Sequence, residues 1–148
     1  MRSPIVLFRF GLDRVFGSRL VMVEHRGRVS GQLRRVVLEV VDRPDTRTIR
    51  VVSGFGRAAQ WYRNIVAEPR VLITSGAVRG APGHAMQLSP QQAQATFARY
   101  AAQHPRAWSR LEPMLVAQVA DHEELAQVIP VVDLVVDHEA TGMVLPPG

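Results

Sequence analysis

The sequence between residues 24 and 35 reads Glu24-His25-Arg26-Gly27-Arg28-Val29-Ser30-Gly31-Gln32-Leu33-Arg34-Arg35. Apolar runs at 20–23 and 36–41 flank this basic stretch, and both runs are rich in β-branched residues. They predict two strands, with Gly27 and Gly31 bracketing the turn between them. Guanidinium groups beside exposed turn amides suit an anion, most naturally a phosphate. The stretch therefore predicts a hairpin with an anion site, although a hairpin salt-bridged to Glu24, Glu39 and Asp42 fits the same pattern.

The composition favours a single domain over residues 1–148, long enough to bury a core without metals or disulfides. The absence of cysteine excludes disulfides and thiolate chemistry, and it fits a cytoplasmic protein. All 18 basic residues are arginine, so a lysine Schiff base is impossible. The arginines form no nucleic-acid-binding motif, so we expect no nucleic-acid partner. A phosphorylated small molecule or an anionic membrane surface remains as the partner of this basic chain.

The two ends of the chain are predicted to differ from its centre. Residues 3–16 begin with Ser3-Pro4 and place apolar residues at helical spacing, which predicts an amphipathic helix over residues 1–18. Its arginines would allow peripheral contact with the inner face of a membrane. Packing against the core is the commoner use of such a helix, and we favour it. We expect the core to span residues 19–138 and residues 139–148 to form a frayed tail.

Further strands are predicted at residues 48–53, 71–75, 81–88 and 131–136, the third of these weakened by Pro82 and Gly83. Helices are predicted at 58–68 and 90–104, the latter with a capping box between Ser89 and Gln92. We also expect a helix at 106–111 that continues to 119 with a kink at Pro113, and a short helical turn at 121–126. About six strands with few, segregated helices predict an α+β domain around a small, mostly antiparallel barrel.

Three ordered motifs carry a family resemblance. They are Gly27-Arg28-Val29-Ser30-Gly31-Gln32-Leu33-Arg34, then Val52-Ser53-Gly54-Phe55-Gly56, then Trp61-Tyr62-Arg63-Asn64 with a stop at Glu68-Pro69. With the final Ile129-Pro130-Val131-Val132, they make residues 20–138 resemble the deazaflavin-dependent nitroreductase family. The resemblance implies a split β-barrel of the FMN-binding type with flanking helices. It also implies the 8-hydroxy-5-deazaflavin coenzyme (coenzyme F-420), which delivers a hydride and carries a phosphodiester and a polyglutamate tail.

The resemblance further implies which residues contact the coenzyme. These are Arg28, Ser30, Gly31, Arg34, Arg35, Val52, Ser53, Gly54, Phe55, Trp61 and Asn64. The arginine turn would hold the phosphate and tail, residues 52–55 would offer backbone groups to the ring, and Trp61 and Asn64 would wall the ring and orient it. Tyr62 and Trp108 would line the acceptor pocket, and no catalytic residue is assigned. Because residues 104–111 contain no tyrosine, this pocket must differ from that of the nitroimidazole-reducing members.

The implied reaction is a two-electron reduction of a small unsaturated acceptor, such as a quinone, an activated alkene or a nitroaromatic. FMN is the alternative cofactor, because Arg28 and Arg34 could bind its phosphate in a similar way. A non-catalytic barrel that holds a lipid, haem or flavin-type ligand is the alternative to an enzyme. The histidine spacing indicates no metal site, and no serine lies in a nucleophile elbow. Monomer and homodimer both remain open.

Overall fold

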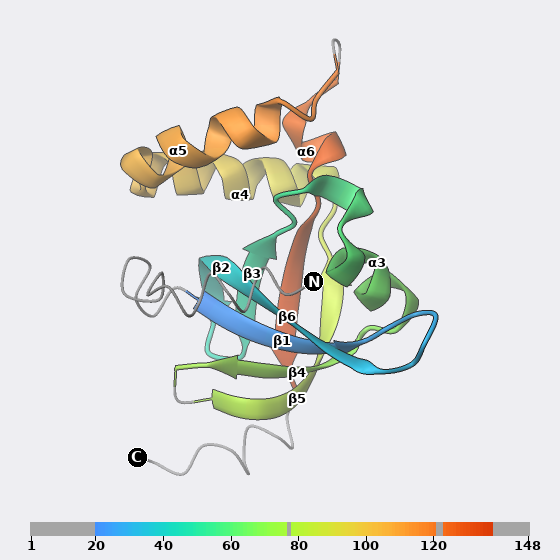
Figure 1. Ribbon diagram of the computed structural model, residues 1–148. Coiled ribbons are helices and arrows are strands. Elements are labelled where there is room, and N and C mark those ends of the chain that lie inside the picture. The colour runs from blue at the N-terminus through green and yellow to red at the C-terminus, as the bar shows by residue number, and fades with distance from the viewer. Residues whose placement is uncertain (1–19, 77, 121–122, 138–148) are drawn as a thin grey trace.

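The structure is a computed structural model that describes residues 20–76, 78–120 and 123–137. Its centre is a closed barrel of antiparallel strands in the order β1-β2-β3-β6-β5-β4, in which β1 also pairs with β4 (Figure 1). The strands are β1 (Leu20–Arg26), β2 (Leu33–Asp45), β3 (Thr48–Val52), β4 (Arg70–Ser75), β5 (Val78–Gln87) and β6 (Val131–Val136). Closure leaves no strand at an open edge, so every strand has a hydrogen-bonding neighbour on both sides. The predicted fold class, an α+β split barrel with flanking helices, is confirmed.

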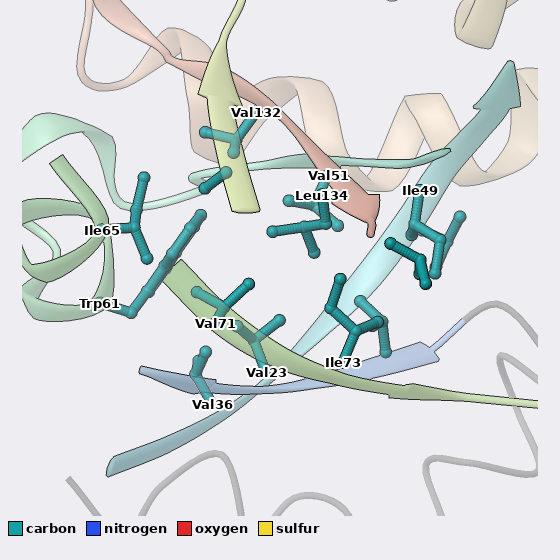
Figure 2. Packing of buried hydrophobic residues seen from close by; sticks show 14 of the residues in the cluster. Val23, Val36, Ile49, Val51, Trp61, Ile65, Val71, Ile73, Val132 and Leu134 are labelled. Atoms are coloured by element: carbon teal, nitrogen blue, oxygen red, sulfur yellow. The ribbon is translucent and has the colours of Figure 1, made fainter. Parts of the chain in front are cut away.

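Alternating side chains of the strands fill the barrel. In β1 the buried residues Val21 and Val23 alternate with half-buried ones, as expected for a strand with one face on a core. Figure 2 shows Val23, Ile73 and Leu134 meeting inside the barrel. Helix α3 (Gln60–Ala67) follows the short 3-10 helix η3 (Gly56–Ala58), and it adds Trp61 and Ile65 to the same core. The core therefore fixes where α3 sits against the β1–β2 hairpin.

A second apolar cluster joins the remaining helices to the barrel. Helices α4 (Pro90–Gln103), α5 (Pro105–Val116) and α6 (Leu125–Val128) pack around Phe97, Leu115 and Ile129. In Figure 1, α4 and α5 lie alongside each other, with α6 next to them. The predicted capping box at the start of α4 is confirmed, because the Ser89 hydroxyl accepts from the Gln92 amide at 3.2 Å and the Gln92 side chain accepts from the Ser89 amide at 2.9 Å.

Several predicted boundaries were wrong. The strand predicted at 81–88 is β5 over residues 78–87, and it begins earlier because Val78 already pairs with Ser75 of β4. Within β5, Gly83 lets β6 come so close that a Cβ at this position would lie 2.5 Å from the Val135 carbonyl oxygen. Helix α5 runs through Pro113, although this residue has no N–H to donate to a helical carbonyl, and it stops at Val116. Of the helical turn predicted at 121–126, the first two residues lie outside the described ones, and the helix found here is α6 at residues 125–128, where Ala126 is buried.

The predicted N-terminal helix over residues 1–18 and the tail at 139–148 lie outside the described residues. In the part of the chain that is described, no helix has both the length and the apolar character needed to cross a membrane.

Candidate functional site

A cleft of about 1280 Å³ lies along the β1–β2 hairpin. Parts of the hairpin, the loop after β3, the start of α3 and one side of α5 line it. At the hairpin turn the lining carries Arg28, Ser30 and Arg34, whereas α5 contributes Leu111 and Met114. The turn and α5 lie on different sides of the barrel (Figure 1). The cleft therefore offers positive charge at one end and apolar surface at the other, which is an arrangement for an elongated ligand with an anionic end.

The turn of the hairpin is held by its own hydrogen bonds. The Gly27 amide donates to the Gln32 carbonyl at 2.8 Å, and the Gly31 amide donates to the Gly27 carbonyl at 2.8 Å. Gly31 has a φ of +74°, in the left-handed region that favours glycine. The Ser30 hydroxyl accepts from the Gln32 amide at 3.1 Å. Ser30 lines the cleft, but Gly31 does not, so Gly31 serves to shape the turn.

Arg28 is fixed by side chains of α3. Its backbone amide and one guanidinium N–H both donate to Asn64 Oδ1, at 3.0 and 2.7 Å, and a second guanidinium nitrogen donates to Gln60 Oε1 at 2.9 Å. These partners are neutral, and no carboxylate of the described residues pairs with Arg28. Arg28 therefore lies in the cleft lining with a charge that no described carboxylate neutralises, as an anion-binding arginine requires.

Arg34 and Arg35 have different surroundings. Arg35 Nε donates to Glu24 Oε2 at 2.9 Å, so this pair matches the predicted salt-bridged hairpin. Within the described ranges Arg34 forms no ion pair. It lies directly across the strand pair from His25. Among the described residues that line the cleft, Arg28 and Arg34 are thus the arginines without an ion pair.

The other carboxylates of the salt-bridged alternative lie in different contacts. Asp42 pairs with Arg99 at 3.2 Å and, more distantly, with Arg50 at 3.9 Å. Glu39 accepts from the Tyr100 hydroxyl at 2.9 Å. These contacts join β2 to α4 and β3, and none of them involves an arginine of the hairpin turn.

Asn64 and His25 form a buried polar pair beneath Arg28. Asn64 is 2% exposed and His25 is 3% exposed, and Asn64 Nδ2 lies 3.2 Å from His25 Nδ1. Burial, and after it the positive charge of Arg34, lowers the pKa of His25 to about 4. His25 is therefore neutral at physiological pH. Asn64, predicted to orient the coenzyme, lines the cleft and also holds Arg28 there.

The loop after β3 is a tight, clamped turn. Ser53 is fully buried, its hydroxyl donates to the Gly56 carbonyl at 2.6 Å and its amide donates to the Pro130 carbonyl at 3.0 Å. The structure therefore places Ser53 beneath the cleft lining, with its amide already engaged inside the protein. Val52, Gly54 and Phe55 do line the cleft, and Phe55 is 74% exposed.

Gln118 holds this loop against the end of α5. Its side-chain amide donates to the Gly54 carbonyl at 2.6 Å and to the Met114 carbonyl at 3.2 Å. A Cβ added to Gly54 would lie 3.4 Å from the methyl group of Met114, so the loop and α5 are closely packed. These two hydrogen bonds of Gln118, called the Gln118 clamp below, hold the loop after β3 against α5 at the apolar end of the cleft.

The predicted aromatic residues do not all lie in the cleft. Trp61 lines the cleft while also packing in the barrel core. Tyr62 packs against the core beside Trp61 and does not line the cleft. Trp108 packs against Phe97 in the second cluster and meets Tyr100 edge-on, and it too is not part of the lining. Neither Tyr62 nor Trp108, predicted to line the acceptor pocket, is thus part of the cleft lining.

Sequence reasoning missed several residues of the site, namely His25, Gln60, Leu111, Met114 and Gln118. Helical spacing of Leu111 and Met114 marks an apolar side of α5, but nothing local shows that this side faces the hairpin. No group of three or more potential metal ligands occurs among the described residues.

Comparison with known proteins adds a family and a fold. A family model described as F420H(2)-dependent quinone reductase matches residues 12–124. No curated protein matches the chain.

Solved structures resemble the chain in fold. An F420-H2 dependent reductase (FDR-A) is 20% identical at a TM-score of 0.54, and the match covers 78% of this chain and 93% of that one. A structure described as a domain-swapped dimer is 19% identical at a TM-score of 0.56, with coverage of 88% and 98%. The haem storage protein HutZ from Vibrio cholerae is 10% identical at a TM-score of 0.56, with coverage of 86% and 89%. At these identities the likeness is one of fold alone.

Proposed function

Because the chain belongs to the F420H(2)-dependent quinone reductase family, we propose that its cleft binds reduced coenzyme F-420 and that a quinone is its acceptor. The protein is an oxidoreductase that uses this coenzyme on a small-molecule substrate. One observation carries the assignment of the cleft. Arg28 and Arg34, without a carboxylate partner among the described residues, lie at one end of a cleft whose other end is apolar.

The residues of the cleft fit the chemistry of the coenzyme. Arg28 and Arg34 would hold the phosphodiester and the carboxylates of the tail, because guanidinium groups bind such oxygens through paired N–H donors. Arg35 would bind more weakly, since Glu24 already pairs with it. The cleft volume of about 1280 Å³ is large enough for a ligand with both a ring and a tail.

The ring would lie toward the apolar end. Trp61 offers an aromatic wall to the cleft, and Phe55 and Met114 offer exposed apolar surface at this end. When bound, the reduced coenzyme supplies a hydride. The protein residues orient the ring and the acceptor, and they exclude water from the space between them. The Gln118 clamp keeps this end in one shape.

The acceptor class follows from the same apolar end. Leu111, Met114 and Phe55 present no charged group to an acceptor, so a flat, weakly polar quinone is the class that fits them best. Activated alkenes and nitroaromatics are the other candidate acceptors, and they are assayed in parallel with the quinone.

The test is a titration of the purified protein with coenzyme F-420 and, in parallel, with FMN. Arg28→Ala and Arg34→Ala should each weaken binding of the deazaflavin by about tenfold to a hundredfold, the value of one charge-assisted contact. Arg63→Ala is the matched control, because Arg63 is exposed on α3 and does not line the cleft. Oxidation of the reduced coenzyme is then followed by absorbance with a quinone, an enone and a nitroaromatic. Equal binding by both cleft variants and the control would refute the site, and oxidation only by the other acceptors would refute the quinone.

A further inference from the structure

A chain of hydrogen bonds runs from the barrel to the arginine turn. It begins at His25, near the end of β1, passes through the Asn64 amide on α3 and ends at Arg28. The first two members are almost completely buried, and Arg28 reaches the cleft. The residues are 39 and 36 positions apart in sequence, so only the fold joins them.

The chemistry of each group fixes its orientation. Both donors from Arg28 require an acceptor, so Asn64 must turn its oxygen toward Arg28 and its NH2 group toward β1. The NH2 group can only donate, so His25 Nδ1 at 3.2 Å must be an unprotonated acceptor. With a donor in its place, the amide would be rotated or left unpaired, and the Arg28 bonds would be lost or weakened.

We propose that His25 is a positioning residue, which sets the orientation of the Asn64 amide and through it holds Arg28 at the anion-binding end of the cleft. This positioning role rests on the proposed function, because it matters for activity only if Arg28 binds the coenzyme. His25 itself lines the cleft, but the role proposed for it acts through Asn64 and Arg28. Its effect should appear in binding of the coenzyme and leave the chemical step unchanged.

A purely structural role for His25 would be to fill space in the barrel end. The two roles differ in their demand on the side chain. Filling space requires only volume, whereas positioning requires an acceptor at the place of Nδ1. The variants are therefore His25→Asn, which keeps an oxygen acceptor near that place, and His25→Leu, which keeps volume but removes the acceptor.

The first readout needs no coenzyme. Amide hydrogen exchange of Arg28 reports the bond from its backbone N–H to Asn64 Oδ1, which is 3.0 Å long. We expect slow exchange in wild type and in His25→Asn, and at least tenfold faster exchange in His25→Leu. The second readout is the KM for reduced coenzyme, expected to rise about tenfold in His25→Leu and less than threefold in His25→Asn, with an unchanged kcat. Unchanged Arg28 exchange in His25→Leu, or equal loss in both variants, would overturn the role.

A measurement on the wild-type protein covers the case in which a variant does not fold. Nitrogen-15 NMR of the histidine ring shows which nitrogen carries the proton, and we expect Nδ1 of His25 to be unprotonated near neutral pH. A protonated Nδ1 would overturn the proposal. The proposed coenzyme site fails separately, if Arg28→Ala binds the coenzyme as wild type does while Arg28 exchange still depends on His25.

Discussion

Acidification from pH 7 to pH 5 is expected to destabilise the fold through His25. The His25 side chain is 3% exposed, and burial and the nearby Arg34 lower its pKa from the ordinary 6.5 to about 4. The unfolded chain therefore takes up a proton at a higher pH than the folded chain does. The stability linked to His25 is fully present above pH 6.5 and is lost as the pH falls toward 4. The groups that face the ring are the amide of Asn64 and the charge of Arg34, and Arg28 lies behind Asn64.

The magnitude follows from the separation of the two pKa values. One pKa unit corresponds to about 1.4 kcal/mol, so the whole separation is worth about 3 kcal/mol once the pH is below the folded value. Between pH 7 and pH 5 only part of this is lost, about 2 kcal/mol. A change of this size is a large fraction of the stability of an ordinary domain.

The assay is urea unfolding at pH 7, 6 and 5, followed by circular dichroism. His25→Asn removes the titrating ring, so its free energy of unfolding should fall by about 2 kcal/mol less than that of wild type over this interval. The control is Ile73→Val, which weakens the same barrel core without removing a titratable group and should keep the wild-type pH dependence. If wild type and His25→Asn lose the same free energy between pH 7 and pH 5, the assignment of a buried, neutral His25 is refuted.

Two further predictions concern the barrel and the loop. Gly83→Ala should lower the free energy of unfolding by about 2 kcal/mol or more, because the new Cβ would lie 2.5 Å from the Val135 carbonyl oxygen. Urea unfolding tests this, with the exposed neighbour Pro82→Ala as control, and an unchanged midpoint would contradict the close approach of β5 and β6. Gln118→Ala should weaken coenzyme binding by about fivefold, the value of a hydrogen bond of about 1 kcal/mol that clamps the Gly54 carbonyl. Fluorescence titration tests this against Gln94→Ala on the exposed side of α4, and equal affinities would show that the Gln118 clamp does not shape the site.

Local patterns in the sequence were sufficient for most of the secondary structure. The β-branched runs on both sides of the arginine turn became β1 and β2, and the capping box at Ser89 begins α4. These features depend on neighbours a few residues apart, so a single sequence contains their physical cause. The bounds of strand β5 were predicted less accurately, since they depend on which of its residues pair with β4 and β6.

The sequence by itself determined the types of element, the arginine turn, and a family resemblance that the family match confirms. Only the tertiary structure decided which residues of these elements form the cleft. In the structure Tyr62 and Trp108 do not line the cleft, whereas Leu111 and Met114 of α5 do. It also joined His25 to Asn64 and Asn64 to Arg28. Such contacts link side chains that lie far apart in the chain, and their geometry exists only once the barrel has closed around its core.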